Sequence, residues 1–424
     1  MKVFKFGGAS VKNASAVKNV SNILSLYKNE KIIVVVSAMG KTTNLLEKAF
    51  ESYQQNNKIE YDSLINQFKT FHQEIAENLF FEQKNAILNQ LECLTKELSD
   101  YYNNKEKASS KDYSHIVSFG ELISSKILSH YLLYNGKSSC WCDAKSIIQT
   151  SKKHEDSSVI WNETQKKYNQ YIPELFKSHS VIVTQGFIGK NSMNETTTLG
   201  REGSDFSAAI FAYCGDAQGV YIWKDVPGML NADPKFFKNT IKLDQISFRE
   251  ALELSYYGAS VIHPKTIKPL HNKGIPLYVK SFLSPQKDGT IIHSSKEKDK
   301  LIPSFIFKHN QILFSIRPKD FSFLVEKNLS DIFSRLAKIN AKINVMQNSA
   351  LSFSILLDHK KINLNQVLST FEDDYQIRYN EGLELVTIRH YDQKTIDFVT
   401  KGKKNILEQK TRHTIRIVLK NYTH

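Results

Sequence analysis

The residue types that phosphate chemistry needs occur in five short polar segments, each of which contains glycine. The first is Lys5–Ser10, which carries Gly7 and Gly8 between an apolar run and a helical pattern. Glycine lets backbone N–H groups approach a phosphate closely, and Lys5 adds a charge that can neutralise a phosphoryl group in transfer. A plain tight turn explains two glycines after a strand equally well, so this segment alone does not decide.

The second segment, Ser37–Asn44, contains Gly40-Lys41-Thr42 and resembles part of a P-loop. The P-loop motif requires a glycine five positions before Gly40. This sequence has Val35 there, inside an expected strand. A P-loop is therefore excluded, and the hydroxyl groups of Ser37 and Thr43 remain as candidates for binding a polar ligand.

Three further segments have the same character. In Ser118–Leu122 we expect a helix to begin, with Glu121 in its first turn, where an isolated glutamate would merely complement the helix dipole. Gly200–Asp205 contains Arg201, whose guanidinium suits a carboxylate, and Trp223–Gly228 follows an expected strand. All five segments follow the carboxyl ends of strands or begin helices, where open α/β sheets place their ligands. Together they predict one site.

The elements that must position this site alternate between short apolar runs and longer helical patterns up to about residue 280. Such alternation predicts a parallel sheet covered by helices. Ser247 and Glu250 form a capping box that opens a helix over Phe248–Tyr257, and residues 45–110 look like a helical excursion. The expected strands are Val3–Phe6, Ile32–Val36, His115–Phe119, Val181–Thr184, Val220–Trp223 and Pro276–Val279.

The carboxyl-terminal third has a different pattern. We expect a first domain over residues 1–283 and a linker over 284–308, because Pro285, Asp288-Gly289 and a lysine-rich run interrupt the periodicity. Residues 309–380 then show the order βαββαβ, and residues 381–424 repeat part of it. Two small ferredoxin-like units, the second incomplete, are the economical interpretation.

The amino-acid composition limits the classes of protein to which the chain can belong. The chain has 424 residues, of which 41% are hydrophobic and 24% charged, as in ordinary soluble proteins of two or three domains. The longest purely apolar stretch, Ala208–Cys214, is far shorter than the ~20 residues of a membrane span. The amino terminus reaches glycines before an apolar signal-peptide core could form. We therefore expect a cytoplasmic protein with no membrane partner.

Charge and cysteine content point to no specialised class. Four cysteines without a C-x-x-C pair argue against a disulfide framework or a zinc site. The formal net charge of +14 fits nucleic-acid binding, a phosphorylated substrate or a lysine-rich surface. Because the lysines are spread along the chain without interleaved aromatic motifs, we favour the solvated surface and expect no nucleic-acid partner.

Six segments, taken in order, resemble the signature segments of aspartokinases, within the amino-acid-kinase superfamily. Residues 311–424 similarly resemble the paired ACT regulatory domains that follow the catalytic domain in that family. The resemblance implies an amino-acid-kinase αβα sandwich with a mainly parallel sheet, followed by ferredoxin-like (ACT) α+β regulatory units. The matching segments are Lys5–Ser10, Ser37–Asn44, Ser118–Leu122, Thr198–Asp205, Trp223–Gly228 with Asp233-Pro234, and Tyr257–Pro264.

The resemblance also implies a reaction and a set of site residues. ATP, carrying Mg²⁺, would phosphorylate the β-carboxylate of L-aspartate to 4-phospho-L-aspartate, the entry to lysine, threonine and methionine synthesis, with no metal cage made by the protein. Lys5 and Asp205 would be catalytic. ATP would be bound by Lys5, Gly7, Gly8, Ser10, Lys224, Asp225, Leu230, Lys235 and Ser260. Aspartate would be bound by Ser37, Thr43, Glu121, Arg201 and Ser204.

Regulation and assembly follow from the same resemblance. Lysine or threonine would bind the first ACT unit, and a homodimer or higher homo-oligomer is expected because ACT units commonly pair across subunits. Asn344 and Ala350 stand where lysine-inhibited relatives often carry Asp and Glu. The candidate effector residues are Asn344, Gln347, Asn348 and Ser349.

Four positions depart from the family pattern. Ala9 replaces a usual threonine, Glu202 a usual glycine, Leu230 a frequent tyrosine and Ser260 a frequent lysine. We expect altered ATP contacts rather than loss of activity.

Two other functions stay open at this point. One is a kinase for glutamate or acetylglutamate, because the sequence gives no dimensions that would exclude one methylene. The other is a non-catalytic amino-acid sensor, against which the intact Lys5, Arg201 and Asp205 argue.

Overall fold

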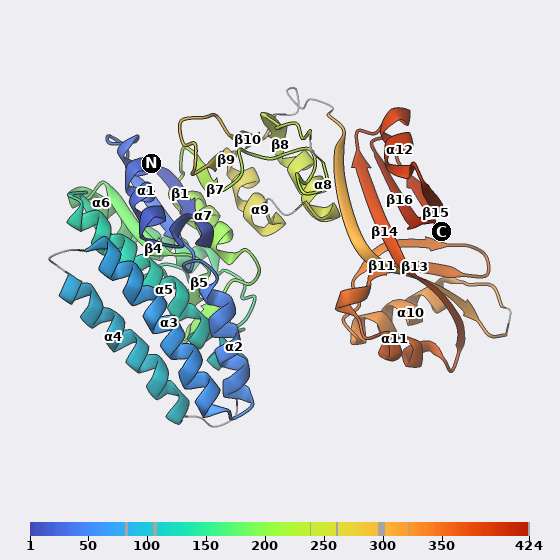
Figure 1. Cartoon of the computed structure of the whole chain (residues 1–424), viewed down its shortest axis with the longest axis horizontal. Helices are drawn as coiled ribbons and strands as arrows, with labels where there is room; N and C mark the ends of the chain where they lie inside the picture. The colour runs from blue at the N-terminus through green and yellow to red at the C-terminus, as the bar shows by residue number, and fades with distance from the viewer. Residues whose placement is uncertain are drawn as a thin grey trace. The chain divides into compact units, whose positions relative to one another are not determined.

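The computed structural model describes residues 1–80, 84–104, 108–237, 239–259, 262–295, 302–320 and 322–422. The chain forms two compact units. Unit 1 comprises Met1–Met229, Lys242–Tyr256 and Ser260–Lys300, and unit 2 comprises Leu230–Ile241, Tyr257–Ala259 and Leu301–His424. Figure 1 shows the elements of each unit.

Unit 1 is built on an eight-stranded sheet in the order β3-β4-β2-β1-β7-β9-β10-β8. Every neighbouring pair is parallel except β9 and β10, which are antiparallel. The sequence prediction of a mainly parallel sheet is confirmed, although β3, β8 and β10 were not predicted. The strands are β1 (Lys2–Phe6), β2 (Ile32–Val36), β3 (Ser139–Cys142), β4 (Val181–Gln185), β7 (Val220–Lys224), β8 (Gln245–Ser247), β9 (Leu277–Ser281) and β10 (Thr290–His293).

Helices cover this sheet (Figure 1). The helical excursion predicted over residues 45–110 is formed by α2, α3 and α4, and these three helices pack with α5. The predicted helix over Phe248–Tyr257 is confirmed as α8. A short hairpin of β5 (Ile188–Lys190) and β6 (Thr196–Thr198) lies outside the main sheet. The helices are α1 (Ala14–Ser25), α2 (Thr42–Gln54), α3 (Lys58–Leu79), α4 (Lys84–Tyr101), α5 (Ser110–Tyr134), α6 (Trp161–Ser178), α7 (Gly203–Cys214), α8 (Phe248–Tyr257) and α9 (Pro264–Lys273).

The predicted strand over His115–Phe119 is wrong, because these residues lie inside the 25-residue helix α5. Ile116 and Val117 are both fully buried. A helix buried on most sides has the same local apolar run as a buried strand, and only the length of the pattern separates the two. As a consequence Glu121 sits in the middle of α5 rather than in a first helical turn.

Unit 2 contains a six-stranded antiparallel sheet in the order β12-β13-β11-β14-β16-β15. The predicted βαββαβ order over residues 311–379 is confirmed. The elements are β11 (Ser304–Pro318), α10 (Glu326–Lys338), β12 (Ile343–Asn348), β13 (Phe353–Asp358), α11 (Leu364–Phe371), β14 (Tyr375–Arg389), α12 (Gln393–Thr400), β15 (Lys403–Lys410) and β16 (Thr414–Asn421).

The second ferredoxin-like unit is completed by a strand from before the first one. Ser304–Lys308, the first part of β11, pairs with residues 385–389 of β14, which in turn pairs with β16. After a register shift between Lys308 and Gln311, β11 continues into the first ferredoxin-like unit. The segment expected to be a linker therefore contains the start of β11, and it also contains β10 of unit 1. Pro285 of this segment does lie in a turn. The strands in the segment were not predicted, because strands this short show too little periodicity in the sequence.

Gly120 has a packing role that generates a first prediction. A Cβ at this position of α5 would lie 2.8 Å from the Cβ of Ala38. Gly120→Ala should lower the free energy of unfolding by about 1–3 kcal/mol through overpacking, although alanine favours helix. Urea denaturation checks this. Ala38→Gly combined with Gly120→Ala should recover most of the loss, and a neutral Gly120→Ala would refute the close packing.

Candidate functional site

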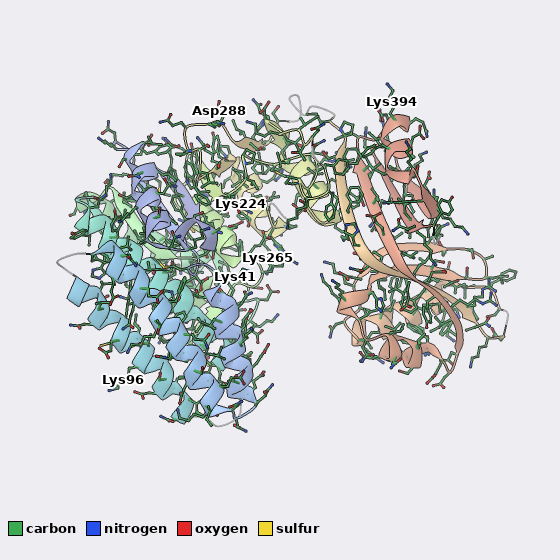
Figure 2. All side chains as sticks on the ribbon, in the orientation of Figure 1. Lys41, Lys96, Lys224, Lys265, Asp288 and Lys394 are labelled. Atoms are coloured by element: carbon green, nitrogen blue, oxygen red, sulfur yellow. The ribbon has the colours of Figure 1, made fainter. Side chains whose placement is uncertain are left out.

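A cavity of about 620 Å³ in unit 1 receives residues from all five polar segments. It is formed where β1, β2 and β7 end and where α2 and α7 begin, as expected for a parallel sheet. Figure 2 shows the side chains of this region, with Lys224 of β7 and Lys265 of α9 labelled. Nine residues that the sequence analysis assigned to the site line the cavity: Lys5, Gly8, Ser37, Thr43, Glu121, Arg201, Ser204, Asp205 and Lys224.

The first two loops are held against each other through their backbones. The N–H of Gly40 donates to the carbonyl oxygen of Gly8 at 3.0 Å. A Cβ on Gly8 would lie 2.6 Å from the carbonyl oxygen of Gly40 and 2.8 Å from that of Ala38. Because no side chain fits there, Gly8 is required for this close approach.

The electrostatic centre of the cavity is a buried carboxylate between two lysines. The Nζ of Lys5 lies 2.7 Å from Oδ1 of Asp205, and the Nζ of Lys224 lies 3.9 Å from Oδ2. Lys5 and Asp205 are 9% and 2% exposed. Burial alone would raise the pKa of Asp205, but the charges of Lys5 and Lys224 outweigh it and hold the pKa below its ordinary value. Asp205 is thus ionised and fixes the ammonium group of Lys5.

The pKa of Glu121, in contrast to that of Asp205, is raised. Its Oε1 accepts a hydrogen bond from the N–H of Ala38 at 3.1 Å. Its Oε2 is buried and has no hydrogen-bond partner among the described residues. Burial raises the pKa of this carboxyl group to about 8, and the hydrogen bonds and the charge of Lys5 offset only part of that rise. Glu121 lines the cavity, and an unpartnered carboxyl oxygen on such a residue is suited to a ligand ammonium group.

Arg201 lies on a tight turn between left-handed residues. Gly200 has φ of +78° and Glu202 has φ of +54°. The family departure at Glu202 therefore places a residue with a Cβ in a conformation that favours glycine. Arg201 is exposed at the cavity wall, where its planar fork can bind a carboxylate.

Several cavity residues were missed by the sequence analysis. Tyr113 of α5 donates its hydroxyl to Oε1 of Glu47 on α2 at 3.1 Å, and both line the cavity. Asp156 also lines it and forms an ion pair with Lys265. Helical spacing could have found the first pair, since Glu47 follows Thr43 by one turn. No local pattern marks Asp156.

Six residues assigned to ATP do not appear in the cavity wall. Ser10 donates its hydroxyl to the carbonyl oxygen of Trp223 at 3.2 Å, and Asp225 is exposed. A Cβ on Gly7 would lie 3.4 Å from the Nζ of Lys5, so Gly7 stays close to the centre. Leu230 and Lys235 belong to unit 2, and Ser260 lies outside the described residues.

The candidate effector residues lie on the edge strand β12 of unit 2 and directly after it. Asn344 of β12 accepts a hydrogen bond from the Nζ of Lys308 at 2.9 Å through Oδ1 and donates to Oε1 of Gln311 at 2.7 Å. Gln347, Asn348 and Ser349 are exposed.

Comparison with known proteins assigns the family. The sequence model of the amino acid kinase family matches residues 1–281. Chloroplastic aspartokinase 2 of Arabidopsis thaliana is 30% identical over 370 residues, which are 85% of this chain and 66% of that protein. Lysine-sensitive aspartokinase 3 of Escherichia coli is 30% identical over 362 residues, 84% of this chain and 78% of that protein.

Comparison with solved structures supports the same family assignment. Escherichia coli aspartokinase III in complex with aspartate and ADP superposes with a TM-score of 0.83 at 26% identity, over 99% of this chain and 96% of that chain. The same enzyme in complex with lysine and aspartate also gives a TM-score of 0.83. Fold and site define a phosphotransferase that acts on a carboxyl group. The chain belongs to the amino acid kinase family and, within it, to the aspartokinases, which phosphorylate L-aspartate with ATP.

Two features of the described residues bear on membrane and metal partners. Over the described residues, none of the helices is both long and apolar enough to cross a membrane. The same residues contain no group of three or more His, Cys, Asp or Glu side chains placed to hold a metal ion.

The environment of Glu121 predicts a pH effect on stability. Its pKa is raised on folding, so the native state binds the proton more tightly and the wild-type free energy of unfolding falls between about pH 4.5 and about pH 8. Glu121→Gln lacks this titration and should gain on the wild type by a few kcal/mol across that range, as denaturation at pH 5 and pH 9 can measure. A difference that does not change with pH would contradict the raised pKa.

Proposed function

We propose that the unit 1 cavity transfers the γ-phosphoryl group of ATP to the β-carboxylate of L-aspartate, giving 4-phospho-L-aspartate and ADP. The observation that carries this proposal is the buried Lys5–Asp205 ion pair in the same cavity as Glu121 and Arg201. One part of the cavity is equipped for a phosphoryl group and another for an amino acid.

Lys5, Gly8 and Lys224 suit the phosphate side. Asp205 holds Lys5 in place, so that its ammonium group can neutralise charge on the transferring phosphoryl group without prior rearrangement. Gly8 leaves room for close approach. A magnesium ion would be brought by the nucleotide and held mainly by phosphate oxygens, with carboxylate oxygen of Asp205 as the donor that fits it best, and it would neutralise phosphate charge.

Glu121, Arg201 and the hydroxyl side chains suit the amino-acid side. Oε2 of Glu121 lacks a partner and would accept a hydrogen bond from the substrate ammonium group. Arg201 would bind the α-carboxylate, because the β-carboxylate has to react. Ser37, Thr43 and Ser204 supply further hydrogen bonds at the cavity wall.

The chemical step needs no general base. The substrate carboxylate is ionised at neutral pH and attacks the γ-phosphorus directly. A bond forms between a β-carboxylate oxygen and phosphorus, while the bond from phosphorus to the bridging oxygen breaks and leaves its electrons on ADP. Positioning and charge neutralisation supply the catalysis.

Glu121 also bears on the competing substrates. Acetylglutamate has no ammonium group, and its binding would leave the buried Oε2 unpaired, which is costly. Glutamate retains the ammonium group and differs by one methylene, which is worth only about 10–200-fold in discrimination. Glutamate is therefore the competitor that the assay must separate.

For regulation and assembly we propose an amino-acid effector, lysine or threonine, at Asn344 and the exposed residues Gln347, Asn348 and Ser349, and a homodimer or higher homo-oligomer in the cytoplasm. Support comes from the ferredoxin-like units of unit 2 and from the Escherichia coli enzyme, whose structure holds lysine with aspartate. Titration of the activity with lysine and threonine, singly and together, tests the effector. Flat curves in all three series would argue against it.

The function is tested by ATP consumption with magnesium, with hydroxylamine present to trap an acyl phosphate. We expect turnover and hydroxamate with L-aspartate, and much less with L-glutamate or acetylglutamate. Turnover with another acceptor would overturn the substrate assignment. Amino-acid binding without any turnover would instead favour the sensor.

Lys5→Met tests the phosphate side. Methionine keeps the apolar length but removes the charge, so kcat should fall by about 10²–10³-fold or more. Lys41→Met is the matched control, since Lys41 is exposed beside the same cavity. Thermal melting of both variants verifies folding. A folded Lys5→Met enzyme with the control's rate would refute the phosphate role of Lys5.

A further inference from the structure

The wall of the unit 1 cavity contains a carboxylate that the proposed reaction does not use. Asp156 lines the cavity together with Arg201, the residue proposed to bind the substrate α-carboxylate. It lies in the segment between β3 and α6, in the same compact unit as Arg201. A free carboxylate beside Arg201 would compete with the substrate for the guanidinium group. The contacts of Asp156 therefore bear on how tightly the enzyme binds aspartate.

Backbone hydrogen bonds hold the Asp156 segment against the strand that leads to Arg201. The carbonyl oxygen of His154 accepts from the N–H of Thr198 at 2.7 Å, and the N–H of Ser157 donates to the carbonyl oxygen of Thr198 at 2.8 Å. Asp156 lies between these two attachment points with φ of +49°. Aspartate and asparagine tolerate this left-handed conformation better than most residues. The backbone thus fixes Asp156 beside the end of β6.

The carboxylate of Asp156 lies against the turn that carries Arg201. The N–H of Gly203 donates to the carbonyl oxygen of Gly200 at 2.9 Å, which places Arg201 and Glu202 at the two central positions of a tight turn. A Cβ on Gly200 would overlap Oδ1 of Asp156. The carboxylate is therefore in contact with the residue that directly precedes Arg201.

Lys265 of α9 engages this carboxylate. Its Nζ forms an ion pair with Oδ1 of Asp156 and donates to the carbonyl oxygen of Leu199 at 3.4 Å. The side chains of Lys265 and Asp156 are 35% and 56% exposed, and ion pairs as exposed as this one add little to stability. Loss of the pair should therefore alter the charge at the cavity wall rather than the fold.

We propose that Lys265 is a positioning residue for the aspartate substrate: it holds the Asp156 carboxylate in an ion pair and so leaves the guanidinium group of Arg201 available to the substrate carboxylate. The inference rests on the proposed function. Without the ammonium group of Lys265, the Asp156 carboxylate would pair with Arg201, and the substrate would have to displace it. Lys5 and Lys224 serve the phosphate side of the cavity, so the affinity for ATP should not change.

The test compares the steady-state kinetics of variants of the full chain. Lys265→Met should raise KM for aspartate about tenfold, because the substrate loses hydrogen bonds to a charged group. KM for ATP and kcat should change little. Lys265→Arg keeps a cation and should recover most of the affinity. Adding Asp156→Asn to Lys265→Met removes the competing carboxylate and should return KM for aspartate most of the way to the wild-type value.

Lys273→Met is the matched control. Lys273 lies at the other end of α9 and forms an ion pair with Asp216. Neither residue is among the described residues that line the cavity, so KM for aspartate should stay at the wild-type value. Thermal melting of all variants verifies folding. If Lys265→Met does not fold, Lys265→Gln, which can still donate to the carbonyl oxygen of Leu199, takes its place.

Each outcome decides one question. A folded Lys265→Met enzyme with an unchanged KM for aspartate overturns the inference. So does a double variant as impaired as Lys265→Met, because removing Asp156 as well cannot repair a contact that was merely structural. Equal rises in KM for ATP and for aspartate also overturn it. A wild-type protein that does not turn over aspartate would refute the proposed function instead.

Discussion

The site of this protein depends on burying one carboxylate where two lysines can reach it. Asp205 lies in the first turn of α7, Lys5 is the last but one residue of β1 and Lys224 is the last of β7, so the ion pair exists only if the parallel sheet brings those ends together. A buried charge without its partners would be costly. The contacts that offset the cost of burying this ion pair also fix the ammonium group of Lys5 at the cavity. A charge fixed in advance can stabilise the transition state without reorganisation of the site.

Glu121 shows how environment divides two carboxyl groups in one cavity between two tasks. Asp205 is paired with lysines and its pKa is lowered, whereas Glu121 is buried with one unpartnered oxygen and its pKa is raised to about 8. Asp205 forms an ion pair with Lys5 of the enzyme itself. Glu121 keeps an oxygen without a hydrogen-bond partner until a ligand cation binds. An amino-acid substrate supplies that cation, so recognition of its ammonium group follows from the missing partner of a buried acid.

Unit 2 is organised by a strand that is shared. β11 completes the second ferredoxin-like unit through Ser304–Lys308 and then belongs to the first one beyond Gln311. Near its start, Asn231 donates a hydrogen bond to the carbonyl oxygen of Pro303 and Phe237 packs against Phe305, all within unit 2. One continuous strand thus joins the two ferredoxin-like units.

The sequence by itself determined the chemistry and most of the elements. Five polar segments, expected at strand ends or helix starts, predicted nine of the cavity residues, because backbone approach at glycine and charge on lysine or arginine are local properties. Only the tertiary structure decided the rest. It placed Glu121 inside a buried helix, where the apolar run resembles a strand, and it closed the second regulatory unit with residues from before the first. It also assigned Leu230 and Lys235 to unit 2. These features depend on pairing between residues far apart in the chain, and no local periodicity encodes such pairing.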